Sequence, residues 1–153
     1  MRRFRIPAIM VLIFTVACGN ISIKTFQRIY VSTMSVDDVL AAKAQIDMAD
    51  NPAKKFQIES GLTERFILLN DVVVKDVVPS TDIDYQFYIL VQAETPKGIV
   101  DFYIYSKDNS TMASLEKGKT HIRALGDFRR FFKLIDNTYV KVDVGDADIS
   151  VKK

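Results

Sequence analysis

YQFYILVQAETPKGIVDFYIYSKDNSTMASLEKGKTHIRAL, residues 85–125, is the stretch of this sequence that decides the fold. Two segments of it, residues 85–94 and residues 99–107, are rich in β-branched and aromatic residues. Such residues favour strands, and the Thr-Pro-Lys-Gly segment between them is typical of a turn. The two segments therefore predict two strands joined by a turn.

The rest of this stretch predicts a short helix followed by another strand. Asp108-Asn109-Ser110 can cap a helix over residues 111–117 (TMASLEK), which Gly118 ends. Polar and apolar residues alternate over residues 119–125, as expected for a half-buried strand. We expect this strand to continue past Gly126, at a bend, into FRRFFKLI. A fifth strand is predicted at residues 139–144.

Upstream of the stretch, the sequence predicts one more strand and two helices. Residues 66–78 (FILLNDVVVKDVV) are rich in β-branched residues and stop at a proline. Ser35 is a predicted N-cap, with Asp38 three residues later as in a capping box. A helical apolar face follows over residues 36–49, and Asn51-Pro52 breaks it before a second helix that ends near Gly61.

The predicted order is strand, strand, strand, short helix, strand, strand, which is the element order of the OB-fold. We therefore predict a mainly β (α+β) domain, a five-stranded OB-fold-like Greek-key barrel with a helix between strands three and four. An N-terminal helical segment precedes the barrel. Over residues 36–149 the chain resembles the bacterial envelope OB-fold family that is named for its similarity to tRNA anticodon-binding domains.

Four features carry this resemblance: the helix with Asn51-Pro-Ala53, the paired strands, LEKGKTHIRALGDF (Leu115–Phe128) and YVKVDVGDADI (Tyr139–Ile149). The sequence departs from the family just before the first strand, where Leu62-Thr-Glu-Arg65 stands in place of a glycine-lysine pair. The resemblance implies a non-enzymatic binding or scaffolding domain, although fold alone does not imply function.

The first eighteen residues have the features of an export signal. Arg2, Arg3 and Arg5 precede the apolar run Pro7–Ala17, which is shorter than the ~20 residues needed to span a bilayer. The segment Thr15-Val16-Ala17-Cys18 resembles a bacterial lipobox, which implies a lipid on Cys18. We expect residues 1–17 to be a lipoprotein signal peptide, residues 18–34 a tether or extra strand, and residues 35–153 the domain. The alternatives are an ordinary cleaved signal or an uncleaved anchor.

Charge and cysteine content narrow the classes of function. The formal net charge is +2, but the three arginines of the leader account for it: without them 21 − 3 = 18 basic residues face 19 acidic ones. A near-neutral domain argues against nucleic acid as a partner, because such binding relies on many phosphate contacts. Cys18 is the only cysteine, so no intrachain disulfide can form.

The first candidate ligand surface is aromatic. If the apolar residues of the second and third strands point inward, alternation places Tyr88, Tyr103 and Tyr105 on the outer face. OB-folds bind oligomers on that face, and tyrosine can stack on bases or sugar rings. The alternative is that the N-terminal helix or residues 19–34 cover these tyrosines.

The second candidate surface is basic. Lys119, Arg123, Arg129 and Arg130 lie in a segment that also contains Lys117, His121 and Lys133, with Asp127 as its single acid. This segment could meet lipid headgroups, anionic glycans or nucleic acid. The alternative is an ordinary solvated strand face with the interleaved phenylalanines in the core.

Candidate chemistry is sparse. Asp143, Asp146 and Asp148 invite a calcium interpretation but lack the ligand spacing of a cation loop, so we interpret them as a solvated strand end. No catalytic motif, metal site or cofactor is predicted. We expect a lipid-anchored binding module of the cell envelope, held at a membrane through Cys18, with an envelope protein or an oligosaccharide as its partner. The alternative is a structural or assembly component of an envelope complex with no small ligand of its own.

Overall fold

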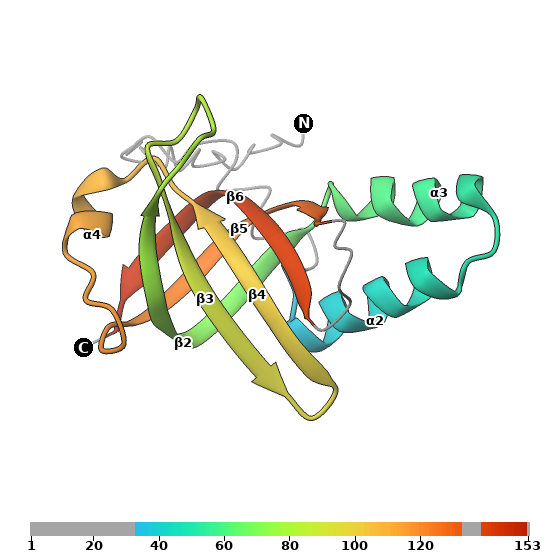
Figure 1. Cartoon of the computed structure of the whole chain (residues 1–153), viewed down its shortest axis with the longest axis horizontal. Coiled ribbons are helices and arrows are strands. Elements are labelled where there is room, and N and C mark those ends of the chain that lie inside the picture. The colour runs from blue at the N-terminus through green and yellow to red at the C-terminus, as the bar shows by residue number, and fades with distance from the viewer. Residues whose placement is uncertain (1–32, 133–138, 153) are drawn as a thin grey trace, which may run out of the picture.

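The computed structural model describes residues 33–132 and 139–152. Strands and helices follow one another in the predicted order (Figure 1). They are β1 (Thr33–Met34), α2 (Val36–Met48), α3 (Pro52–Leu62), β2 (Phe66–Pro79), β3 (Phe87–Thr95), β4 (Gly98–Tyr105), α4 (Asn109–Ala113), β5 (His121–Phe131) and β6 (Val140–Val151).

Five of these strands close into a barrel. Their order is β2-β3-β4-β6-β5, and β2 also pairs with β5, so no long strand is left as a free edge. Only β4 and β6 are parallel within this ring. With α4 between the third and fourth barrel strands, this is an OB-fold-like Greek-key barrel, and the predicted fold class is confirmed.

The long strand β2 makes closure possible because it changes partner along its length. Its first half, up to Val73, pairs with β5, and its second half, from Val74, pairs with β3. The register against β5 shifts between Leu69 and Val72, where Asp71 has a φ of 58°. An irregularity of this kind bends a strand and increases its twist.

The core lies inside the barrel and follows the predicted alternation. On β4, Val100, Phe102 and Ile104 are fully buried. At the predicted bend, the register between β5 and β6 shifts between Leu125 and Asp127. A Cβ on Gly126 would lie 2.6 Å from a methyl carbon of Val144, so glycine lets the two strands approach.

The two N-terminal helices differ in how far they pack onto the barrel. Ser35 and Asp38 form the predicted capping box at the start of α2. This helix buries three residues, whereas α3 buries only Leu62. In Figure 1 the hairpin of α2 and α3 extends to one side of the barrel.

The boundaries of the short helix and of the last strand differ from the predictions. The short helix covers Asn109–Ala113 rather than residues 111–117, because Asp108 caps it and the chain after Leu115 forms a turn. That turn is held by the amide of Gly118, which donates to the carbonyl of Val74 at 2.8 Å. The last strand runs to Val151 rather than to residue 144, since it also pairs with the first half of β5.

The predicted tether or extra strand lies mostly outside the described residues. Its last residues, Thr33 and Met34, form β1, which pairs in parallel with the start of β2. Cys18 and the signal peptide also lie outside the described part of the chain. No helix within residues 33–132 and 139–152 is both long enough and apolar enough to cross a membrane.

Candidate functional site

The outer face of the barrel carries a continuous row of aromatic rings. Tyr88 of β3 contacts Tyr103 and Tyr105 of β4, with ring centroids 5.4 and 5.5 Å apart. The row extends at one end to Tyr85, 5.4 Å from Tyr105, and at the other to Phe132, 4.9 Å from Tyr103. We call these five residues the aromatic row.

The two ends of the aromatic row differ in accessibility. Tyr105 and Tyr85 are buried, with 9% and 4% of their surface exposed, whereas Tyr88, Tyr103 and Phe132 are partly exposed. Burial, followed by the charge of Asp143, raises the pKa of Tyr105 to about 12. The accessible part of the row therefore runs from Tyr88 through Tyr103 to Phe132.

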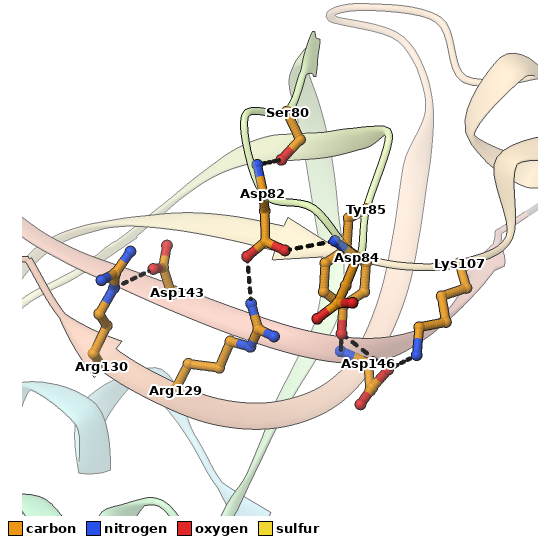
Figure 2. Close-up of polar contacts among 9 residues, drawn as sticks. All are labelled: Ser80, Asp82, Asp84, Tyr85, Lys107, Arg129, Arg130, Asp143 and Asp146. Atoms are coloured by element: carbon orange, nitrogen blue, oxygen red, sulfur yellow. Dashed lines mark hydrogen bonds and ion pairs between the residues drawn. The ribbon is translucent and has the colours of Figure 1, made fainter.

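The loop between β2 and β3 lies beside the buried end of the row, and two side-chain contacts tether it (Figure 2). The Tyr85 hydroxyl donates to Asp146 Oδ1 at 2.9 Å, and Arg129 Nη1 donates to Asp82 Oδ2 at 3.1 Å. The Arg129 guanidinium also lies 4.9 Å from the centroid of the Tyr85 ring. Arg129 thus joins the loop to the barrel.

A buried carboxylate lies beside the exposed part of the row. Asp143 of β6 lies opposite both Tyr103 and Arg130 in the strand pairings, and its side chain is only 3% exposed. Arg130 Nε donates to Asp143 Oδ2 at 2.6 Å (Figure 2). Burial raises the pKa of Asp143, and the nearby Arg130 opposes that shift. The other oxygen, Oδ1, is buried and has no hydrogen-bond partner within the described residues.

A cleft opens next to this pair. It has a volume of about 580 Å³ and lies between α3 and the second half of β5. Arg130 and Phe132 line it and thereby connect it to the aromatic row. The remaining lining residues are Phe56, Glu59, Ser60, Thr63, Phe128, Arg129 and Phe131. The volume falls within the range of small-molecule sites.

The predicted basic residues do not form a single surface. Arg129 and Arg130 lie beside the aromatic row, each paired with an aspartate. Lys119 pairs with Glu116 at 3.0 Å in the turn before β5. Arg123 is exposed and lies opposite Ser150, towards the far end of β6 from Asp143. Neither Lys119 nor Arg123 therefore belongs to the site.

The interpretation of the three C-terminal aspartates as a solvated strand end is wrong for Asp143. This residue is buried by the neighbouring strands and paired with Arg130. Asp146 instead accepts from Tyr85 and lies 3.3 Å from Lys107 Nζ. No group of three histidine, cysteine or acidic side chains within residues 33–132 and 139–152 is placed to hold a metal ion.

Sequence reasoning missed Tyr85, Asp82 and Phe132 as parts of this site. The sequence predicts that Tyr85 begins a strand, but it belongs to the preceding loop and turns back onto Tyr105. One signal was present: the acid in Val142-Asp143-Val144 interrupts an apolar strand, and buried charges in proteins are normally paired.

Comparisons with known proteins add little to this geometry. No family model matches the chain. No curated protein is significantly similar to it either. One similar solved structure is the OB domain of a protein from Methanosarcina mazei, which is 18% identical over 57% of this chain and 71% of that one, with a TM-score of 0.30. The assignment of an OB-type barrel therefore depends on the strand order and closure within this chain.

Proposed function

We propose that this protein is a lipid-anchored module of the bacterial cell envelope that binds an oligomeric ligand on the outer face of β3 and β4. One observation carries the proposal: Tyr88, Tyr103 and Phe132 form a partly exposed platform of rings. OB barrels bind oligomers on this face, and aromatic rings stack on flat or ring-shaped ligands.

The polar groups around the platform support binding rather than catalysis. Asp82 and Asp143 are each engaged with an arginine, and Asp101 Oδ1 accepts from Gln92 Nε2 at 2.8 Å. Side chains locked by such contacts give a surface of fixed shape, which lowers the entropy lost when a ligand binds.

The anchoring part of the proposal depends on the N-terminal segment. A single thiol follows a basic and then an apolar stretch, with alanine directly before it. Two or three fatty chains on Cys18 would hold the protein at a bilayer, at about 0.8 kcal/mol per buried methylene. Mass spectrometry of the mature N-terminus tests this directly, with Cys18→Ser as the control. An unmodified N-terminus at any other residue refutes the anchor.

The ligand face is tested by substitution within the aromatic row. Tyr103→Ala should abolish the capture of envelope material that the unaltered protein retains from detergent extracts. Tyr139→Ala is the matched control, because Tyr139 is 42% exposed and lies outside the row. Equal capture by the two variants would show that the row is not the binding surface.

A second candidate function is a structural component of an envelope complex. The helical hairpin supports it: Met48 and Phe56 are 77% and 71% exposed, and α3 buries a single residue. A helix so weakly attached to its own domain is better explained if another protein packs on it. A stoichiometric partner that is lost with Phe56→Ser but kept with Tyr103→Ala would favour this function.

A further inference from the structure

Arg130 differs from the other basic residues of the site because its guanidinium is both fixed and open to solvent. Its Nε is bonded to the buried Asp143, yet 69% of the side chain is exposed. Within residues 33–132 and 139–152 no hydrogen bond from its terminal amino groups is found. Those groups form a planar fork of donors, which matches the two oxygens of a carboxylate.

The fork is held in place from two sides. Asp143 lies directly opposite Arg130 in the antiparallel pairing of β5 and β6, so the backbone sets where the carboxylate stands. The guanidinium carbon also lies 5.4 Å from the centroid of the Phe132 ring. Since both contacts exist before any ligand arrives, little side-chain entropy is lost on binding an anion.

We propose that the ligand is an acidic oligosaccharide, with a sugar carboxylate bound by the amino groups of Arg130 and sugar rings stacked on Phe132, Tyr103 and Tyr88. Asp143 is the positioning residue for Arg130. The inference depends on the proposed function, because it assigns the chemistry of the ligand at the same face. The cleft beside Arg130 and Phe132 provides room for the sugar that carries the carboxylate.

The acids of this face are already engaged, so the open polar group is the guanidinium of Arg130. Asp101 and Asp143 are buried, 8% and 2% exposed, and accept from Gln92 and Arg130. The fork of Arg130 is one cation, whereas nucleic-acid binding relies on many phosphate contacts. A sugar chain that carries a carboxylate matches the face better, because its carboxylate can pair with the fork while the apolar faces of its rings stack on the aromatic row.

The test compares oligogalacturonate with its methyl ester, which has the same rings but no charge. Calorimetry with the full lipidated chain in detergent should show that the acid binds and that the ester binds about 10- to 100-fold more weakly. Arg130→Gln should weaken the binding of the acid by a similar factor and leave the binding of the ester unchanged. Arg123→Gln is the matched control, an exposed arginine on the same strand outside the site.

A second variant separates loss of binding from loss of folding. Because Arg130→Gln alone leaves Asp143 buried and unpaired, Arg130→Gln/Asp143→Asn removes both charges together. It should keep the thermal midpoint and still lose the preference for the acid over the ester. If Asp143 positions Arg130, Asp143→Asn alone should also weaken the binding of the acid but not the binding of the ester.

The outcomes separate this inference from the proposed function. If acid and ester bind equally and Arg130→Gln has no effect, while Tyr103→Ala abolishes binding, the face binds a ligand but the carboxylate assignment is wrong. If Tyr103→Ala leaves all binding intact, the proposed face is wrong. If the acid does not bind at all, the acidic-sugar inference is overturned.

Discussion

The two faces of strand β4 show how one segment serves stability on one side and recognition on the other. Val100, Phe102 and Ile104 point into the barrel and are fully buried. Asp101, Tyr103 and Tyr105 alternate with them on the outer face, where closure of the barrel does not require aromatic rings or a carboxylate. The inner face therefore accounts for folding, and the outer face is free to carry a site.

The largest difference in stability between the two faces is expected when one aromatic ring is removed from each. Phe102→Ala should lower the free energy of unfolding by about 3–5 kcal/mol, because it leaves a cavity in a fully buried core. Tyr103→Ala should lower it by only about 1 kcal/mol, the value of its ring contacts. Urea denaturation measures both. Equal losses would mean that the outer rings are part of the structural core.

A smaller loss of stability is expected at Gly126, where strands β5 and β6 lie too close together for a side chain. A methyl group at residue 126 would lie 2.9 Å from Ala147 Cβ as well as close to Val144, so Gly126→Ala should cost about 1–3 kcal/mol. Gly61→Ala on α3 is the control: nothing lies within 4 Å, and alanine favours a helix by about 0.5–1 kcal/mol. The two substitutions should move the unfolding midpoint in opposite directions.

The inner face was predictable from the sequence, and most of the outer site was not. Alternation along residues 99–107 is a local pattern, so it predicted which residues of β4 enter the core and that the tyrosines lie outside. The pairing of Arg130 with Asp143 depends on the register of β5 against β6, which shifts between Phe128 and Arg130. No local pattern carries such a shift, because it depends on how the closed barrel accommodates its own twist.

The same limit explains the error over Asp143 and the omission of Tyr85. An aspartate near the end of a strand is usually solvated, so its burial follows only from neighbours that tertiary packing supplies. Tyr85 lies next to a strand in the sequence, but its hydroxyl reaches Asp146, 61 residues away. Contacts between residues so distant in sequence require the folded barrel.

The buried Asp143 of the outer face should make stability depend on pH in a way that an exposed aspartate does not. Because burial raises the pKa of Asp143, the folded protein holds this proton more tightly than the unfolded chain. The stability that this provides is present at low pH and is lost as the pH rises through the raised pKa. Asp143→Asn removes the titration, so its unfolding free energy relative to the wild type should increase as the pH rises above 3.8, the ordinary pKa of aspartate. A difference that stays constant with pH would contradict the burial.

The smallest effect expected at neutral pH concerns the hydroxyl of Tyr105. Tyr105→Phe keeps the ring contacts with Tyr85 and Tyr88, so its unfolding free energy at pH 7 should stay within about 0.5 kcal/mol of the wild type. In alkali the two proteins should diverge. With a pKa of about 12 in the folded state against 10.0 in the unfolded chain, Tyr105 favours folding below pH 10 and loses that contribution between pH 10 and pH 12.

The Tyr105→Phe variant lacks this titration and should lose less stability than the wild type over the same alkaline range. Its absorbance titration should also lose amplitude near pH 12, because the phenol with a pKa of about 12 is gone. If that amplitude is unchanged, Tyr105 is not shielded from water as its burial requires. The division of the aromatic row into a buried end and an accessible part would then be wrong.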